Sequence, residues 1–359
     1  MMKKVLFYIY SLNKGGAERV LLTLAQKLSE EYEVLILTDK YEEREYELPD
    51  GIQRINLQQY MEKCSRFQKG IFRRLSAIRG CCRKEKPDAI ISFMVSGSIR
   101  AVLANLFTGN RVIVAVRSNP YDEYGRWLKK LMLQIVFSFA EKIVCQTPYQ
   151  TEYFCKPLRK KCIVIPNPLF ADFYMDPYEG ERRKEIVSAG RLFDYKNHKL
   201  LIRAFAQIAE EFPEYNVTIW GEGPYRKELE EEIRIHNLES RVFLPGDSSR
   251  VAEDIYIAAL FVLPSDTEGM PNALMEAMSL GLPVIATDCP CGGPRSLIRH
   301  GENGMLCEVG NTTDLAEQMR KVLGDPELQK KLGRNALSIR ERCHVDRISE
   351  KWSRLIDGK

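Results

Sequence analysis

Short apolar runs alternate with segments of helical period along almost the entire chain. Twelve such runs can be followed through the 359 residues, six in each half. They are residues 5–10, 34–38, 89–93, 112–116, 142–147, 162–167, 185–190, 217–221, 242–246, 260–265, 283–288 and 305–309. This alternation is typical of βαβ units, in which buried parallel strands are covered by crossover helices. We therefore predict an α/β protein made of two doubly wound units, each with its own parallel sheet.

A segment without clear periodicity separates the two sets of runs. Residues 164–183 contain three prolines and one glycine among side chains of mixed polarity, as is usual for a connection. We predict residues 1–167 as an N-terminal unit, 168–183 as a linker and 184–342 as a C-terminal unit. Residues 343–359 have helical period, and we expect this helix to cross back to the N-terminal unit.

Charge is distributed unevenly between the two halves. Residues 1–178 contain 28 Lys and Arg against 19 Asp and Glu, whereas residues 179–359 contain 25 against 30. Much of the excess lies in Lys63–Lys86, where nine basic side chains accompany a single acid, Glu85. The apolar residues of this stretch recur at helical spacing: Phe67, Ile71, Phe72, Leu75 and Ile78. A basic helix of this kind fits a membrane surface, a nucleic acid or a solvated face.

The ten cysteines do not form a metal-binding or redox motif. None is part of a Cys-x-x-Cys pair, and no His stands at zinc-ligand spacing from a cysteine pair. We expect reduced, mostly buried thiols, which predicts a cytoplasmic protein. The N-terminal KKVLFYIY has no adequate apolar core or cleavage site for a signal peptide. The longest apolar stretch, residues 131–140, is too short to span a bilayer.

Two glycines follow the first apolar run. Gly15 and Gly16 precede a predicted helix at Ala17–Glu31, where free backbone N–H groups can bind an anion. A tight turn without a ligand would have the same sequence. The dinucleotide fingerprint Gly-x-Gly-x-x-Gly is absent, which argues against a hydride-transfer enzyme.

Further candidate residues follow the strands of the second half. Gly190-Arg191 and, five residues on, Lys196-Asn197 would place two cations at a strand's carboxyl end, as a diphosphate site requires. A surface loop with solvated charges is the alternative. The turn Trp220–Tyr225, which contains Glu222, fits a ribose or a flat base.

The densest motif is Leu263–Pro283. Pro271 fits the first position of a helix and Gly281 the position just past its end, so Glu268 stands in the preceding loop and Glu276 inside the helix. The residues alone leave open that Glu276 is solvated and that Glu268 only complements the helix dipole.

In combination, these motifs resemble those of retaining, nucleotide-sugar-dependent glycosyltransferases of family 4. That family has the GT-B fold, in which two Rossmann-like domains face one another across a cleft. The resemblance covers nearly the whole chain, especially GGAERV (15–20), SAGRL (188–192), WGEGP (220–224), SDTEGMPNALMEAMSLGLPVIATD (265–288) and GGP (292–294). It is greatest to bacterial enzymes that extend lipid-linked oligosaccharides or capsular and exopolysaccharide repeats.

The resemblance assigns roles to residues of this chain. Arg191 and Lys196 would hold the donor diphosphate, and with Glu268, which would bind the donor sugar, they form the expected catalytic set. Glu276 would accept hydrogen bonds from the ribose. The other implied donor-binding residues are Gly15, Gly16, Gly190, Glu222, Gly269, Met270, Pro271 and Asn272.

One position departs from the family pattern. Many relatives carry a His in the N-terminal domain where this chain has Arg117-Ser118-Asn119. We therefore expect Arg117, Asn119 and Glu18 to contact the acceptor or the leaving phosphate.

The resemblance implies a hexosyltransferase that moves a hexose or N-acetylhexosamine, with retention, from a UDP-sugar to a saccharide linked to polyprenyl diphosphate. No metal is expected, because no Asp-x-Asp motif stands at a strand end. The enzyme is expected at the inner face of the cell membrane, bound to anionic lipid through the Lys63–Lys86 face, with no nucleic-acid partner. The alternatives are a hydrolysing epimerase of the same fold, an inactive structural relative and, more distantly, a nucleic-acid-binding protein.

Overall fold

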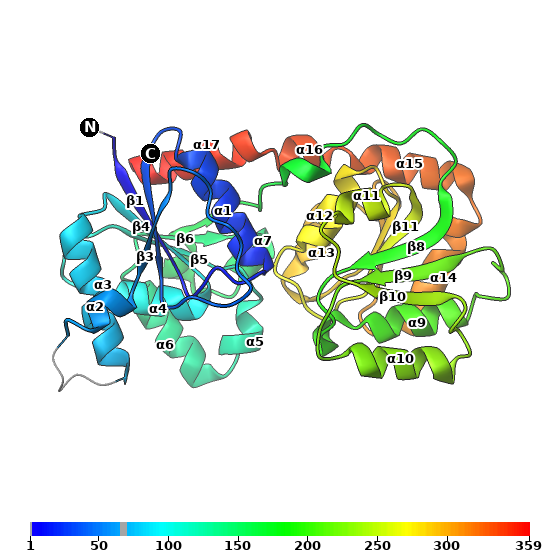
Figure 1. The fold of residues 1–359 in the computed structure, drawn as a ribbon, viewed down its shortest axis with the longest axis horizontal. Helices are drawn as coiled ribbons and strands as arrows, with labels where there is room; N and C mark the ends of the chain where they lie inside the picture. Colours follow the sequence, from blue (N-terminus) through cyan, green and yellow to red (C-terminus); the bar gives the residue numbers. More distant parts are fainter. Residues whose placement is uncertain (1, 65–69) are drawn as a thin grey trace. The chain divides into compact units, whose positions relative to one another are not determined.

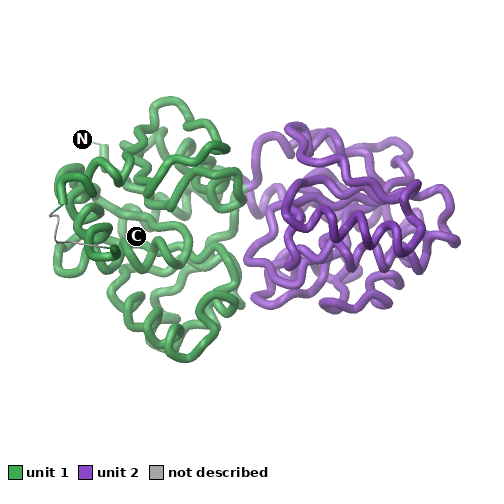
Figure 2. Tube along the Cα trace, turned by 60° about the horizontal axis from the view of Figure 1, so that its bottom comes forward, with its two compact units in different colours: residues 1–168, 345–359 green, residues 169–344 purple. Residues whose placement is uncertain are grey.

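The computed structural model describes residues 2–64 and 70–359, which form two compact units (Figure 2). Unit 1 contains the chain up to Pro168 together with Val345–Lys359, and unit 2 contains Leu169–His344. The segment expected to be a linker lies in unit 2 from Leu169 onward, and its Phe170 and Phe173 are buried.

Unit 1 is organised around a seven-stranded sheet (Figure 1). All neighbouring strands pair in parallel, and Leu6 lies opposite Leu35 on one side and Ile90 on the other. From edge to edge the strands are β3 (Gln53–Asn56), β2 (Glu33–Thr38), β1 (Lys4–Ile9), β4 (Ala89–Phe93), β5 (Val112–Ala115), β6 (Lys142–Cys145) and β7 (Cys162–Val164).

Helices cover both faces of this sheet, which explains why its strands are apolar on both sides. One face carries α3 (Gly70–Glu85), α4 (Val95–Ala104) and α6 (Trp127–Phe137), whose core includes side chains of β1 such as Leu6. The other face carries α1 (Gly16–Leu28) and α17 (Val345–Asp357), which pack together. The short helices are α2 (Gln58–Met61), α5 (Pro120–Tyr124), α7 (Pro148–Thr151) and α8 (Lys156–Arg159).

Unit 2 repeats the architecture with six parallel strands. In sheet order they are β10 (Val242–Gly246), β9 (Asn216–Trp220), β8 (Arg183–Ala189), β11 (Ala258–Leu263), β12 (Val284–Thr287) and β13 (Met305–Cys307). Its α-helices are α9 (His198–Ala206), α10 (Arg226–Ile235), α11 (Val251–Tyr256), α12 (Asn272–Ser279), α13 (Gly293–Leu297), α14 (Thr312–Leu323), α15 (Pro326–Ala336) and α16 (Ile339–Arg342). Three 3₁₀ turns, η1 (Ala171–Phe173), η2 (Asp194–Lys196) and η3 (Pro290–Gly292), complete the unit. The predicted doubly wound α/β architecture is confirmed.

The basic stretch Lys63–Lys86 differs from the expected helix. Within the described residues α3 covers Gly70–Glu85, and Ile71 and Phe72, expected on its apolar face, are exposed. The side chains that reach the core come from the second half of the helix: Ala77, Ile78, Cys81 and Cys82. The expected contributions of Arg66, Phe67 and Lys69 lie outside the described residues.

Two arginines of α3 form hydrogen bonds to the backbone of other segments of unit 1. Arg73 Nε donates to the carbonyl of Met61 at 3.0 Å. Arg79 donates to the carbonyls of Ala104, the last residue of α4, and of Leu106, just past it, at 2.7 and 3.0 Å. The bonds from Arg79 satisfy carbonyls at the C-terminal end of α4, where the last carbonyls of a helix have no intrahelical partner.

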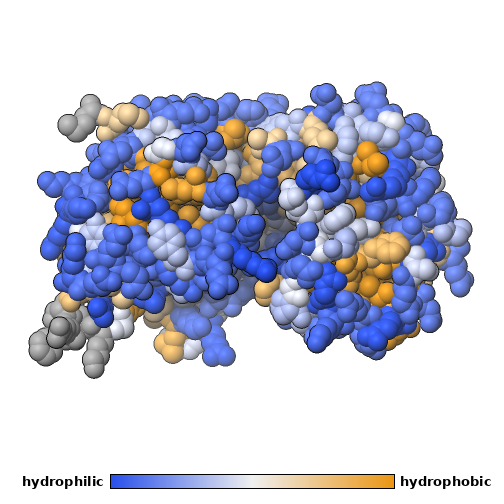
Figure 3. Space-filling model, viewed as in Figure 1, coloured by the Kyte–Doolittle hydropathy of each residue, from blue (hydrophilic) through white to orange (hydrophobic). Residues whose placement is uncertain are grey.

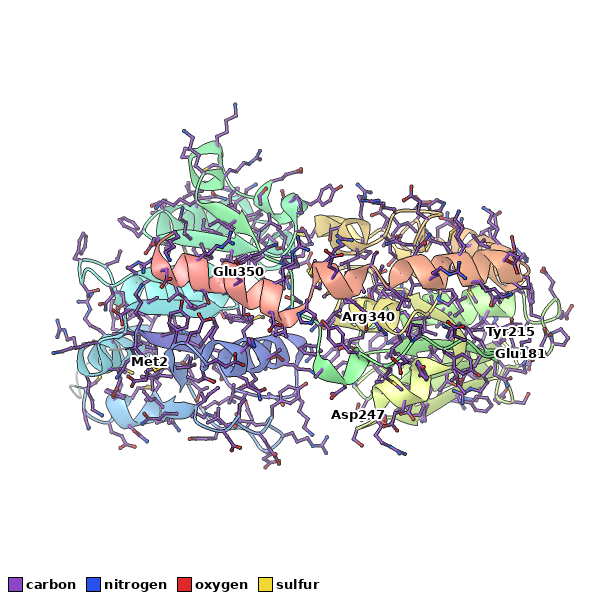
Figure 4. All side chains as sticks on the ribbon, turned by 90° about the horizontal axis from the view of Figure 1, so that it is seen from above. Met2, Glu181, Tyr215, Asp247, Arg340 and Glu350 are labelled. Atoms are coloured by element: carbon purple, nitrogen blue, oxygen red, sulfur yellow. The ribbon has the colours of Figure 1, made fainter. Side chains whose placement is uncertain are left out.

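The C-terminal helix α17 is anchored in unit 1 by a large aromatic side chain. Trp352 is fully buried and stacks on Phe93 of β4, with ring centroids 6.2 Å apart. At the outer side of the same helix, Glu350 is exposed and pairs with Arg354 (Figure 4).

We predict that Trp352→Ala destabilises unit 1 by about 3–5 kcal/mol, because it leaves a large cavity under α17. Urea unfolding followed by far-UV circular dichroism measures this change. The control Glu350→Ala removes only a surface ion pair of the same helix and is expected to cost at most about 0.5 kcal/mol. Equal effects of the two substitutions would contradict the assigned anchor.

Candidate active site

The strand order of unit 2 indicates where along its sheet a ligand is expected to bind. The chain builds β8, β9 and β10 in one direction and then returns to place β11 on the other side of β8. In doubly wound sheets ligands bind beyond the carboxyl ends of the strands at such a switch point. Two loops leave from this position, Gly190–Asn197 after β8 and Ser265–Pro271 before α12.

An ion pair joins these two loops. Lys196 Nζ lies 2.6 Å from Glu268 Oε1, and the same oxygen accepts a hydrogen bond from Ser265 Oγ at 2.8 Å. The Lys196 and Glu268 side chains are 20% and 11% exposed, so the pair is largely shielded but open on one side. Two of the three predicted catalytic residues are therefore in direct contact.

A second set of contacts holds the loops in this arrangement. Asn197 Nδ2 donates to Asp266 Oδ1 at 2.7 Å, and the Asp266 amide donates to the carbonyl of Tyr195 at 2.9 Å. Asn197 also caps α9, since its Oδ1 accepts from the Leu200 amide, and its left-handed backbone (φ 47°) turns the chain into the helix. Lys196 thus projects from a loop fixed on both sides.

These supporting residues were not among the predicted site residues. Ser265, Asp266 and Asn197 all stand within the motifs that were singled out. In the sequence, the signal that identifies them is a polar side chain beside a predicted ligand-binding residue in a loop. The loops must also follow strands that are neighbours in the sheet.

The third predicted catalytic residue, Arg191, lies on the same loop as Lys196. It is exposed; its guanidinium lies 5.0 Å from the Phe193 ring, and Nη2 donates to the Tyr195 hydroxyl at 3.4 Å. Gly190, just before it, has φ 154° and open space where a side chain would stand. The loop therefore has the uncovered backbone of Gly190 directly beside the exposed guanidinium of Arg191.

Glu276 is buried, only 8% exposed, on α12. The solvated alternative for this residue is therefore wrong. Pro271 is the N-cap of α12 rather than its first helical residue, and Asn272 begins the helix. The amides of Gly269, Met270 and Asn272 accordingly stand at or just before the helix N-terminus, where partial positive charge favours an anion or a sugar oxygen.

Glycines in these loops allow backbone to pack against backbone. A Cβ at Gly221 would lie 2.0 Å from the Gly190 carbonyl oxygen, and one at Gly293 would lie 2.4 Å from that of Gly269. Both glycines stand in motifs singled out in the sequence, and in the structure they allow neighbouring loops to approach closely. Glu222, in the loop of Gly221, is exposed and forms an ion pair with Arg226, which lowers the pKa of its carboxyl.

The remaining predicted residues belong to unit 1. Gly15 is the N-cap of α1, Gly16 is its first residue, and Glu18 lies in the first turn. The Glu18 carboxylate lies over Gly15, 2.4 Å from where a Cβ would stand. Glu18 is the third residue of the helix, the position that the acidic partner takes in a capping box.

Arg117 and Asn119 follow β5. Arg117 is 8% exposed, donates from Nη1 to Asn167 Oδ1 at 3.0 Å, and lies 4.4 Å from the Phe93 ring. Burial lowers the pKa of its guanidinium to about 9. Asn119 caps α5 by accepting from the Tyr121 amide at 3.1 Å.

His198, next to the site, is a buried neutral side chain. Its Nδ1 lies 3.4 Å from Ser188 Oγ, and its Nε2 has no hydrogen-bond partner in the described structure. Burial, with a smaller contribution from the charge of Lys196, lowers its pKa to about 3.

Within residues 2–64 and 70–359, no group of three or more His, Cys, Asp and Glu side chains is arranged to hold a metal ion. No helix in the same described part of the chain is long and apolar enough to cross a membrane.

Comparison with known families decides the class of protein. Residues 14–173 match the family described as "Glycosyltransferase Family 4", and residues 176–338 match "Glycosyl transferases group 1". The chain belongs to the family 4 glycosyltransferases. The predicted resemblance is confirmed, and Lys196 and Glu268 fall in the part matched to the group 1 domain.

Two relatives match this glycosyltransferase over nearly its whole length. It is 27% identical, over 99% of its length and 98% of the relative, to a Campylobacter jejuni enzyme named GalNAc-α-(1→4)-GalNAc-α-(1→3)-diNAcBac-PP-undecaprenol α-1,4-N-acetyl-D-galactosaminyltransferase. An uncharacterized glycosyltransferase of Haemophilus influenzae is 25% identical, over 99% of this chain and all of the relative.

Solved structures share the fold of this glycosyltransferase. HepE of Anabaena in complex with UDP has a TM-score of 0.82 at 18% identity, with complete coverage of both chains. A mutant of TarM from S. aureus has a TM-score of 0.82 at 15% identity, over 99% of this chain and all of the other. The GT-B fold is confirmed.

We predict that Lys196→Ala lowers sugar transfer by about 10³-fold or more, because a fixed cation is lost where negative charge develops. Initial rates at saturating donor measure the effect, with thermal unfolding as a check on folding. Lys227→Ala, on the exposed face of α10, is the matched control and is expected to transfer at the wild-type rate. Near wild-type turnover of the Lys196 variant would exclude the catalytic role.

We also predict that His198 makes unit 2 acid-sensitive. Its folded-state pKa of about 3 lies below the ordinary 6.5, so the unfolded chain binds the proton first as the pH falls. The stability is complete above pH 6.5 and is lost progressively below it, by about 2 kcal/mol between pH 7 and pH 5. Urea midpoints at both pH values should show a smaller loss in His198→Asn. An identical pH dependence in both proteins would refute the assignment.

Proposed function

We propose that the chain is a retaining glycosyltransferase that moves a hexose or N-acetylhexosamine from a UDP-sugar to a saccharide linked to polyprenyl diphosphate. The observation that carries the proposal is the Lys196–Glu268 pair at the switch point of unit 2. Its lysine lies on the loop that also carries Arg191. In such a pair the cation can bind a donor diphosphate, and the carboxylate beside it can accept a hydrogen bond from a sugar hydroxyl.

The chemistry requires stabilisation of the leaving group. As the bond between the anomeric carbon and the phosphate oxygen breaks, negative charge grows on the diphosphate and positive charge on the sugar. Lys196 and Arg191 supply fixed positive charge for the diphosphate, and the amides at the start of α12 add partial charge. We propose that these groups replace a metal ion.

Glu268 and Glu276 are assigned to the donor's hydroxyl groups. Glu268 is held by Ser265 and Lys196, so its second carboxylate oxygen has a fixed direction in which to accept from a sugar hydroxyl. Glu276 is proposed to accept from the ribose. Gly15, Gly16, Gly190, Glu222, Gly269, Met270, Pro271 and Asn272 remain the proposed lining of the donor.

Retention of configuration needs the acceptor to attack from the face that the diphosphate leaves. We propose that a β-phosphate oxygen takes the proton of the acceptor hydroxyl, since Glu268, the carboxylate of the predicted catalytic set, is assigned to the donor sugar. Glu18, Arg117 and Asn119 stay assigned to the acceptor or the leaving phosphate, although Asn119 also caps α5.

Support for the donor and acceptor comes from relatives. HepE was crystallised with UDP and with UDP-glucose, and the Campylobacter jejuni enzyme carries undecaprenyl diphosphate in its name. A lipid-linked acceptor would bring the enzyme to the cytoplasmic face of the cell membrane. We propose that the Lys63–Lys86 face attracts anionic lipid there; Lys63, Arg83, Lys84 and Lys86 are its exposed cations in the described structure.

The test is a transfer assay with purified protein. A panel of UDP- and GDP-sugars is incubated with a polyprenyl-diphosphate-linked saccharide, and products are identified by mass spectrometry. The proposal predicts an acceptor extended by one hexose or N-acetylhexosamine, and UDP release that depends on the acceptor. Acceptor-independent interconversion of the UDP-sugar would indicate an epimerase instead, and the absence of any product would overturn the proposal.

A further inference from the structure

Helix α6 of unit 1 presents an apolar surface to solvent. Trp127, Leu128, Leu131, Met132 and Ile135 are between 43% and 71% exposed, although large apolar residues are normally buried. In the space-filling view, hydrophobic side chains reach the lower edge of unit 1, where α6 lies in Figure 1 (Figure 3).

These side chains form one continuous face of the helix. Leu128, Leu131, Met132 and Ile135 are spaced by three and four residues, so they lie above one another along one side. Phe139, just past the helix end, extends the same side and is 56% exposed. We call these residues, together with Trp127, the α6 face.

The α6 face is separate from the contacts that hold the helix on the sheet. Leu133, Val136 and Phe137 point into the core and are buried. The helix is therefore apolar on both sides. Packing in the core of unit 1 explains the buried side but not the exposed one. A contiguous exposed apolar surface of this kind marks an interaction site.

Basic side chains surround the α6 face. No acid occurs from Arg126 to Ala140, and Lys129 is exposed on the helix itself. Lys161 Nζ donates to the carbonyls of Ser138 and Ala140 at 2.7 and 2.8 Å, which places a cation at the end of the helix.

The segment after the helix brings further cations. Gln134 binds the backbone of Tyr153 and Cys155, so the start of α8 is held against α6. The exposed cations of that segment are Lys156, Arg159 and Lys160. The nearest acids in the sequence are Asp122 and Glu123 of α5, Glu141, which pairs with Arg111, and the exposed Glu152.

We infer that the α6 face inserts into the interfacial region of an anionic lipid bilayer, with the basic residues around it on the headgroups. An amphipathic surface with an exposed Trp and a basic rim fits that environment. A second copy of the chain fits poorly, because a symmetric dimer would place the two basic rims against each other. The inference rests on the proposed function, in which the acceptor's lipid lies in the same bilayer.

Vesicle binding tests the inference with a triple variant, Leu128→Ser/Leu131→Ser/Ile135→Ser. Cosedimentation is measured with phosphatidylglycerol–phosphatidylcholine vesicles and with phosphatidylcholine alone. We expect the wild type to prefer the anionic vesicles and the triple variant to bind them at least tenfold more weakly. Phe107→Ser removes an apolar side chain that is 97% exposed outside the α6 face, and this control is expected to bind like the wild type.

Fluorescence locates the contact. Anionic vesicles should shift the tryptophan emission of the wild type to the blue, and Trp127→Phe should abolish the shift. Undiminished vesicle binding by the triple variant, or no binding by the wild type, would overturn the inference. So would a wild-type dimer that the triple variant dissociates, without any blue shift on vesicles.

Transfer to a short-chain, water-soluble acceptor is measured in parallel without vesicles. We expect the triple variant to keep the wild-type rate in that assay, which also shows that it is folded. Absence of transfer by the wild type, with vesicle binding intact, would overturn the proposed function and leave the α6 face as a membrane contact.

Discussion

The parallel sheet is the constraint from which the rest of the molecule follows. Because every strand of a unit runs in the same direction, all the loops that follow the strands emerge at one edge. In unit 2 the chain reverses its direction of sheet building between β8 and β11, and the loops at that point carry Lys196 and Glu268. Lys196 and Glu268 are 72 positions apart in the sequence, and the order of the strands is enough to bring them into contact.

Most strands of the fold could be predicted from the sequence because they are buried on both faces and read as continuous apolar runs. β3 was missed, since only Ile55 of this four-residue edge strand is buried. The apolar face of α3 was predicted only in part: Ile78 is buried and Leu75 packs against the core, whereas Ile71 and Phe72 are exposed. Its period resembles that of a simple amphipathic helix, but two of its arginines bond to carbonyls of other segments and two of its apolar residues face solvent.

The candidate site was predictable by residue type but not by arrangement. Glycines, cations and acids after strands indicate a ligand edge, yet only the fold shows which loops are neighbours. Asn197 illustrates the difference: in the sequence it is a residue beside a lysine, whereas in the structure it caps α9 and holds Asp266 of the other loop. The burial of Glu276 depends on how other segments pack around α12. The helical period of the sequence does not predict this packing.

Backbone hydrogen exchange with and without UDP tests the central claim most directly, because it requires neither the right sugar nor the right acceptor. If UDP binds at the switch point of unit 2, exchange should slow in residues 190–197 and 265–276, around Lys196 and Glu268. Protection restricted to unit 1, or no change in these two loops at a saturating UDP concentration, would contradict the account.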